Sequence, residues 1–318
     1  MSNIALITGP NGQDGSYLME FLISKGYQVH GLIRRTSQPL MENIGHLRDQ
    51  ITLHPGDMTD AGSIQNAIEK IMPTEIYNLA GMSQVRWSYD VPAMTMDVNC
   101  GGLLRIIESV RGLKLDCKIY QACSSEMFGK VQEVPQKETT PFYPRSPYGV
   151  SKAAAYYMAR VYRESYGMKI YCGFLFNHES PRRGEEFLSR KVCKAVAEIV
   201  NGTRTKLTLG NLDAKRDFGY AKEYVEWIWQ IMQSVPDDYV ISTGETHSIK
   251  EFVELAFSHV GISNWEDYVE YDKSLTRPAE VDLLIGDSTK SKNLLGFEPK
   301  VKFKELVKIM VDAELKKV

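Results

Sequence analysis

The sequence predicts an α/β protein built around a doubly wound parallel sheet, with a smaller, discontinuous α/β domain in its C-terminal part. Three observations lead to this prediction. An apolar strand, a glycine-rich turn and a helix open the chain; apolar strands and helical stretches then alternate over about 175 residues; and the length of 318 residues exceeds the usual size of one core. We expect residues 1–175 with roughly 212–244 to form a Rossmann domain, and 176–211 with 245–318 to form the second domain.

The first strand, Ile4–Thr8, ends in a turn with glycines at positions 9, 12 and 15, and a helix is expected over Ser16–Lys25. Glycines permit a tight turn and close approach of the backbone to a ligand. A helix N-terminus offers free N–H groups and the positive end of its dipole. This segment therefore predicts a binding turn for the pyrophosphate of a dinucleotide, with a plain turn as the alternative.

The second strand, Gln28–Ile33, is followed by Arg34 and Arg35, where an acidic residue would bind the ribose 2′-hydroxyl of NAD. A guanidinium fork suits a 2′-phosphate instead. We therefore predict NADP rather than NAD, and a solvated basic loop is the alternative.

The alternation of strands and helices continues toward the middle of the chain. Strands are expected at 51–54, 75–79 and 118–122, and helices at 63–71 and 98–110. The carboxyl ends of parallel strands meet at one edge of a sheet. Asp57, after the third strand, is thus placed to accept from an adenine amino group, and the small residues of 80–84 leave room for a dinucleotide.

Acid and base groups follow the fifth strand. Ser124 and Glu126 come just after it, and Tyr148 and Lys152 stand at i and i+4 on a helix expected to run to about Tyr166. An ammonium beside a phenol favours the phenolate, so this pair suits proton transfer on an alcohol. The alternatives are an amphipathic helix that begins with a tyrosine, and a helix-capping or solvent-facing carboxylate.

The C-terminal part mixes helices with polar loops. The pattern predicts a strand at 169–176, a polar loop at 177–184, helices at 189–201 and 220–234, a strand at 240–242, and helices at 248–260 and 304–315. The Arg and Lys side chains between 182 and 216 suit a diphosphate, although solvated loops explain such charges equally well.

Composition argues against several partners. The net charge is −2, so no nucleic-acid partner is expected. Five cysteines without C-x-x-C or metal-ligand spacing indicate reduced thiols in a cytoplasmic protein and no metal site. The chain enters its first strand without a leader, and no apolar run reaches the roughly 18 residues of a membrane span, so no membrane partner is expected.

Longer strings of residues resemble those of the GDP-mannose 4,6-dehydratases, a family of extended short-chain dehydrogenase/reductases. They are the glycine turn and helix start at 7–18, the segments 143–149 and 209–217, and 175–183, which contains Asn-His-Glu-Ser-Pro-Arg-Arg. The resemblance spans nearly the whole chain, and the spacing G-x-x-G-x-x-G of the turn is similar to that of extended dehydrogenases.

The resemblance implies roles for individual residues. Catalytic roles fall on Ser124, Glu126, Tyr148 and Lys152. NADP binding falls on Gly9, Asn11, Gly12, Gln13, Asp14, Gly15, Arg34, Arg35, Asp57, Met58, Ala80, Tyr148, Lys152, His178 and Arg183. Binding of the nucleotide sugar falls on Asn177, Lys191, Leu209, Gly210, Asn211, Arg216, Arg277 and Glu280.

The resemblance also implies the redox-neutral dehydration of GDP-mannose to GDP-4-keto-6-deoxy-mannose with tightly bound NADP. Tyr148, supported by Lys152, would accept the C4 hydroxyl proton, while Glu126 would remove the C5 proton and assist loss of the C6 hydroxyl as water. The alternatives are the same chemistry on a GDP-heptose, a nucleotide-sugar epimerase or reductase, and a catalytically silent NADP-binding regulator.

The chain departs from the family at four places, one of which is the glycine turn, where Pro10 and Asn11 replace the usual residues. Ser124 stands where the family usually has threonine, and Phe218 and Tyr220 replace tryptophan and histidine. The segment between Ser37 and Ile51 is shorter than in the family, where this region helps to bind NADP and to build a tetramer. We therefore expect a homodimer or a homotetramer.

Overall fold

Seven parallel strands form the central sheet in the order β11-β6-β5-β4-β1-β2-β3. The structure is a computed structural model that describes residues 3–37, 41–275 and 279–318. The strands are β1 (Ile4–Thr8), β2 (Gln28–Ile33), β3 (Ile51–Pro55), β4 (Glu75–Asn78), β5 (Lys118–Ser124), β6 (Ile170–Leu175) and β11 (Asp238–Ile241). The chain runs outward from β1 through β2 to β3 and then returns to β4 on the other side of β1. Such a reversal opens a crevice at the carboxyl edge of a sheet.

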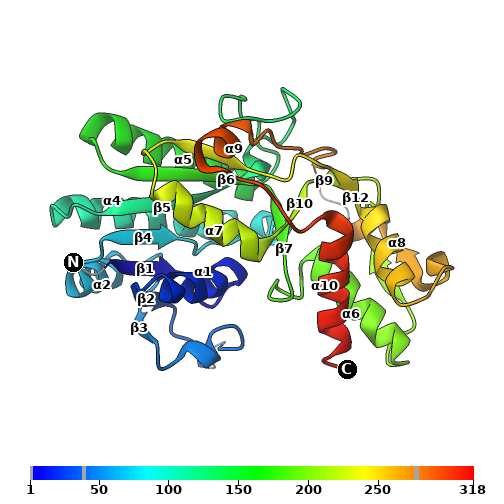
Figure 1. Ribbon diagram of the computed structural model, residues 1–318. Coiled ribbons are helices and arrows are strands. Elements are labelled where there is room, and N and C mark those ends of the chain that lie inside the picture. Colours follow the sequence, from blue (N-terminus) through cyan, green and yellow to red (C-terminus); the bar gives the residue numbers. More distant parts are fainter. Residues whose placement is uncertain (1–2, 38–40, 276–278) are drawn as a thin grey trace.

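Helices cover both faces of this sheet, as Figure 1 shows. One face packs on α2 (Ala61–Ile71), α4 (Gly102–Gly112) and α5 (Pro147–Tyr166), and the other on α1 (Gln13–Ser24) and α7 (Ala221–Met232). Successive side chains of a strand point to opposite faces. In β1, Leu6 therefore joins the first core, whereas Ala5 and Ile7 join the second. This arrangement confirms the predicted doubly wound parallel sheet.

A smaller lobe contains a third apolar core around α6 (Leu188–Val200), α8 (Ile249–His259) and α10 (Phe303–Leu315). Three short strand pairs surround it: β7 (Asn177–Glu179) with β10 (Phe218–Tyr220), β9 (Lys215–Arg216) with β12 (His247–Ser248), and β8 (Leu207–Leu209) with β13 (Val269–Tyr271). The predicted loop at 177–184 is thus partly wrong, since its first residues form a strand. The three residues of β7 are all polar, so they lack the apolar pattern by which a strand is predicted. Their parallel partner, β10, also lies far away in sequence.

The chain crosses repeatedly between the two lobes. After β10 it returns to the large sheet through α7 and β11, and α9 (Thr289–Leu295) packs against both of these elements before the chain reaches α10. Among the described residues, no helix is both long and apolar enough to span a membrane. All five cysteines are free thiols.

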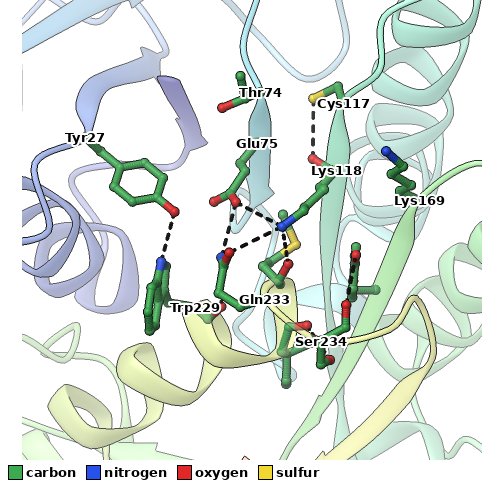
Figure 2. Close-up of polar contacts among 12 residues, drawn as sticks. Tyr27, Thr74, Glu75, Cys117, Lys118, Lys169, Trp229, Gln233 and Ser234 are labelled. Carbon is green, nitrogen blue, oxygen red and sulfur yellow. Dashed lines mark hydrogen bonds and ion pairs between the residues drawn. The ribbon is translucent and has the colours of Figure 1, made fainter. Parts of the chain in front are cut away.

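A buried polar cluster fastens the end of α7 to the amino edge of the sheet (Figure 2). Glu75 opens β4, and its carboxylate accepts hydrogen bonds from the Tyr77 hydroxyl at 2.6 Å and from the Gln233 amide at 3.2 Å. Lys118 Nζ lies 3.4 Å from the same carboxylate and donates to the Met232 carbonyl at 2.7 Å. The cluster therefore joins two strands and a helix through one carboxylate.

Replacing Glu75 by alanine should lower the free energy of unfolding by about 3 kcal/mol, because it leaves the buried phenol of Tyr77 without its acceptor and removes the carboxylate beside the half-buried Lys118 ammonium. Urea unfolding followed by circular dichroism measures this change. The control is Asp116→Ala, which removes the exposed ion pair with Lys169 at the same edge of the sheet. The control should change stability by less than about 0.5 kcal/mol. Equal losses in the two variants would refute a stabilising role for the cluster.

Candidate active site

A cavity of about 690 Å³ runs along the carboxyl edge of the sheet. Its walls come from the residues that follow β1, β2, β3, β4, β5 and β6, from the start of α5, and from α6 and β8 in the smaller lobe. The cavity therefore lies at the reversal of strand order, where open α/β sheets bind ligands.

The turn after β1 lies very close to its neighbours. Gly9 has a φ of +67°, which favours glycine, and a Cβ there would lie 3.0 Å from the backbone of Ala80. A Cβ on Gly15 would lie 2.3 Å from the Gly9 carbonyl oxygen. The missing side chains bring the first turn of α1 to the floor of the cavity, where its N–H groups can meet an anion.

A chain of hydrogen bonds connects the strand ends beneath the cavity. Thr8 Oγ1 donates to Asn78 Oδ1 at 2.8 Å, and Asn78 Nδ2 donates to Gln121 Oε1 at 2.7 Å. Gln121 Nε2 then donates to the Ala122 carbonyl at 3.0 Å, and this carbonyl also accepts from Lys152 Nζ at 2.8 Å. Sequence reasoning missed Asn78 and Gln121. The available signal was an amide near the end of two otherwise apolar strands.

The helix that carries Tyr148 is pressed against the segment that carries Glu126. Ser146 caps α5 by accepting from the Gly149 N–H at 3.0 Å, and a Cβ on Gly149 would lie 2.6 Å from the Glu126 carbonyl oxygen. Ser124 Oγ accepts from the Glu126 N–H at 3.2 Å. These contacts place Ser124, Glu126 and Tyr148 on one wall of the cavity.

The environment of Tyr148 differs from the sequence expectation. Burial raises its pKa to about 12, although a hydrogen bond with Ser124 acts in the opposite direction. Burial also lowers the pKa of Lys152, whose Nζ lies 5.9 Å from the centre of the phenol ring. Burial thus outweighs the neighbouring charges in the protein alone, and the effect of Lys152 on the phenolate stays a prediction. Sequence spacing gave the proximity of the two residues but not their burial.

Asn99 is a further residue that sequence reasoning missed. Its side chain accepts from the Met82 N–H at 2.8 Å and donates to Ser151 Oγ at 2.8 Å. Ser151 in turn donates to the Tyr148 carbonyl at 2.7 Å. Asn99 lies in a π-helical segment, Asp97–Gly101, that precedes α4. Asn99 fixes the loop after β4 against the first turn of α5. No local sequence motif predicts this contact, because its partners are distant in sequence.

Asp14 and His178 form a buried pair between α1 and β7. His178 Nε2 lies 2.9 Å from Asp14 Oδ2, and Nδ1 lies 2.8 Å from the Phe176 carbonyl oxygen. Both partners are acceptors, so both ring nitrogens carry a proton, and the ring stacks on Tyr224 at 4.9 Å. Burial opposes this charge, but the Asp14 carboxylate outweighs it and raises the pKa of His178. Burial is outweighed in the same way for Asp14, where the charge of His178 lowers the pKa.

Most of the residues predicted for the site line this one cavity. They are Gly9, Asn11, Gly12, Gln13, Asp14, Gly15, Arg34, Asp57, Met58, Ala80, Ser124, Glu126, Tyr148, Lys152, Asn177, His178, Arg183, Lys191, Leu209 and Gly210. The exposed Arg35 and three residues of the smaller lobe, Asn211, Arg216 and Glu280, lie outside its lining. Arg277 falls outside the described residues.

Asp57 and Arg216 have partners within the chain. Asp57 accepts from the Thr59 N–H at 2.9 Å and from the Thr59 hydroxyl at 2.7 Å, which lowers the pKa of its carboxyl. Arg216 is buried, and its Nη1 donates to the Lys215 carbonyl at 2.9 Å. Within the described ranges, no group of three or more His, Cys, Asp or Glu residues is arranged to hold a metal ion.

Comparisons with known proteins agree with this arrangement. The sequence profile of the family described as GDP-mannose 4,6 dehydratase matches residues 6–310. The chain is 50% identical over 325 residues to GDP-mannose 4,6 dehydratase 1 of Arabidopsis thaliana, with 98% of this chain and 90% of that protein covered. It is 48% identical over 340 residues to the human GDP-mannose 4,6 dehydratase, with 98% and 91% covered. Among solved structures, UDP-glucose 4-epimerase of Thermus thermophilus with NAD has a TM-score of 0.88 at 25% identity, with 99% of this chain and 100% of that chain covered.

Replacing His178 by glutamine should reduce stability most at mildly acidic pH. The raised pKa of His178 makes its pair with Asp14 fully stabilising below the ordinary value of 6.5, and this contribution is lost as the pH rises through the folded value. The pKa of Asp14 is lowered from its ordinary value of 3.8, so the stabilisation by the Asp14–His178 pair is fully present above pH 3.8 and is lost only at lower pH. The difference in free energy of unfolding between wild type and variant should therefore be largest between these values and shrink toward pH 9.

Urea unfolding at a series of pH values tests this expectation. His259→Gln is the control, because His259 pairs with Asp312 at the surface. A wild-type advantage over His178→Gln that grows with rising pH would contradict the assigned protonation.

Proposed function

This chain belongs to the GDP-mannose 4,6 dehydratase family, and on this premise we propose that it removes water from GDP-mannose to give GDP-4-keto-6-deoxy-mannose. It is then a hydro-lyase. The observation that carries the proposal is a carboxylate, Glu126, on the same cavity wall as Tyr148 and Ser124. An epimerase or reductase needs proton transfer only at the oxidised carbon, whereas loss of water needs a second acid and base at C5 and C6.

We propose NADP as the cofactor. The cradle formed by Gly9 and Gly15, which a side chain would fill, fits a pyrophosphate at the N-terminus of α1. Arg34 lines the cavity after β2 and would pair with a ribose 2′-phosphate. When bound, NADP supplies the hydride acceptor and donor of a reaction that leaves it unchanged overall.

The residues of this chain then divide the proton transfers between them. Tyr148 takes the proton of the sugar C4 hydroxyl, and Ser124 hydrogen-bonds the same oxygen and favours the deprotonated phenol. Because burial raises the pKa of Tyr148 to about 12, this transfer requires added positive charge, which a bound nicotinamide ring and Lys152 would provide together.

Glu126 acts on the 4-keto sugar. The C4 carbonyl makes the C5 hydrogen acidic, so the carboxylate removes that proton. It then returns the proton to the departing C6 hydroxyl, and water leaves a 4-keto sugar with a C5–C6 double bond. Bound NADP would supply the hydride that C6 needs, and the proton that Tyr148 took from the C4 hydroxyl balances the one that C5 then accepts. Glu126 is nearly buried, at 9% exposure, so bulk water does not replace it in either transfer.

We further propose that residues 1–175 with roughly 212–244 bind the cofactor, and that 176–211 with 245–318 bind the nucleotide sugar. Asn177, Lys191, Leu209 and Gly210 support this division because they line the cavity from the smaller lobe. The substrate roles of Asn211, Arg216, Arg277 and Glu280 stay predictions, as does Arg35 for the cofactor. The placement in the cytoplasm also stays a prediction; five free thiols are compatible with it.

We propose that the chain forms a homodimer through α5. Val150, Tyr157 and Val161 are exposed and repeat at seven and eleven residues, so they lie on one face of a helix with about 3.6 residues per turn. The exposed Met94 of α3 (Pro92–Met96) and Trp87 extend this surface beside α5. An uncharged, aromatic stripe can pack against its own copy about a twofold axis without like-charge repulsion.

The proposed reaction is tested by incubating the purified protein with GDP-mannose and no added reductant, followed by mass spectrometry of the nucleotide sugar. Wild type should give a product lighter by one water. Glu126→Gln should reduce this product at least about 100-fold, since general acid and base groups contribute on that order. An unchanged sugar mass with wild-type protein would refute the dehydratase, and full turnover by Glu126→Gln would refute the role of this carboxylate.

Tyr157→Asp should convert the proposed dimer to a monomer, because the aspartate would be buried at its centre. Light scattering after size-exclusion chromatography measures the mass. Tyr166→Asp is the matched control, since Tyr166 is an equally exposed tyrosine of α5 nine residues further on, and so on the opposite side of the helix. A wild-type monomer, or a Tyr157→Asp variant that still dimerises, would refute this interface.

A further inference from the structure

Four carboxylates line the cavity among the described residues: Asp14, Asp57, Glu126 and Glu186. Three of them are already accounted for. Asp14 pairs with His178, Asp57 accepts two hydrogen bonds from Thr59, and Glu126 faces the reaction. Within the part of the chain that the structure describes, Glu186 makes no hydrogen bond or ion pair. Its role has not yet been explained.

Glu186 precedes α6 and has defined surroundings. A Cβ on Gly184 would lie 2.7 Å from each of its carboxylate oxygens, so the carboxylate rests against the Gly184 backbone. The neighbouring Glu185 behaves differently. Its carboxylate contacts Lys194 at 2.6 Å and Arg190 at 3.4 Å, and it does not line the cavity. Of two adjacent glutamates, only Glu186 is therefore available to a ligand.

Apolar side chains of the smaller lobe line the same cavity as Glu186. Phe187, Leu188, Leu209 and Leu275 line it, and a Cβ on Gly210 would lie 3.3 Å from that of Leu275. A narrow apolar slot with a few polar groups suits a flat heterocycle. This slot belongs to the smaller lobe, the part for which we propose binding of the nucleotide sugar.

The Glu186 carboxylate is exposed to water in the free protein, so a ligand that covers it must offer it hydrogen-bond donors in place of water. Among nucleobases, guanine presents two adjacent donors, N1–H and the 2-amino group, which match the two oxygens of one carboxylate. Adenine and uracil place an acceptor beside each donor on the corresponding edge, and that acceptor would face the carboxylate. The charge of Glu186 thus favours guanine and disfavours the other bases.

Resting on the proposed function, we propose that Glu186 is a specificity-determining residue that binds the N1–H and 2-amino donors of the substrate guanine. The contact lies away from the reacting sugar. Its loss should therefore weaken binding of the nucleotide and leave the chemical step nearly unchanged.

Calorimetric titration with GDP and with IDP tests this assignment, because hypoxanthine keeps N1–H and lacks the 2-amino group. Wild type should bind GDP about ten-fold more tightly than IDP, consistent with the loss of one charge-assisted hydrogen bond. In Glu186→Gln, the Kd for GDP should rise at least about ten-fold and the preference for GDP over IDP should fall below about three-fold. Glu185→Gln is the matched control and should keep both the affinity and the preference of wild type.

An unchanged GDP affinity and an unchanged GDP/IDP ratio in Glu186→Gln would overturn the proposal, as would a wild type that binds GDP and IDP equally well. Titration with nucleotides involves no chemistry, so it is independent of the dehydration assay. A protein that binds GDP through Glu186 but leaves GDP-mannose intact would contradict the proposed reaction alone. A dehydratase with no change in Glu186→Gln would contradict the base contact alone.

Discussion

The close approach of the turn after β1 to the end of β4 determines where the remaining parts of the site lie. A Cβ on Gly9 would lie 3.0 Å from the backbone of Ala80, and a Cβ on Gly15 would lie only 2.3 Å from the Gly9 carbonyl oxygen. The start of α1 consequently lies at the reversal of strand order. From there the chain of side-chain hydrogen bonds through Asn78 and Gln121 extends the same edge to Lys152. A side chain at Gly15 would push the start of α1 away from Gly9, which itself lies against the end of β4.

Charge within the cavity is balanced locally. The carboxylate of Asp14 would oppose a diphosphate at the helix start, but it is paired with the protonated His178 at 2.9 Å. Arg183 lies on the same wall, beside Glu179 at 3.3 Å and over the ring of Phe187 at 3.9 Å. Of the carboxylates in the described lining, Asp14 is thus paired with a cation, and the cationic side chains of Arg34, Arg183 and Lys191 lie in the same lining, so the cavity stays suited to anionic ligands.

Local patterns predicted the sheet well and placed Tyr148 and Lys152 at its carboxyl edge, where both line the cavity, because apolar strands, glycine spacing and the i, i+4 relation of these two residues are short-range signals. The sheet is confirmed, whereas the chemical roles of the side chains stay proposals. Other features depend on partners distant in sequence. The β7 strand pairs with β10, Glu75 meets Gln233 after α7, and Asn99 meets Ser151. The raised pKa of Tyr148 could not be predicted from the sequence either, because it results from burial, which depends on the folded chain.

The repeated crossing of the chain between the lobes has a consequence for how ligands enter. β7 leaves the large sheet and β10 returns to it as hydrogen-bonded neighbours, and further crossings follow after β11 and after α9. A rigid-body opening of the lobes would have to bend all of these connections together, including the hydrogen-bonded pair of β7 and β10. This architecture therefore favours exchange of ligands by rearrangement of loops and side chains at the mouth of the cavity, while the angle between the lobes stays nearly constant through a catalytic cycle.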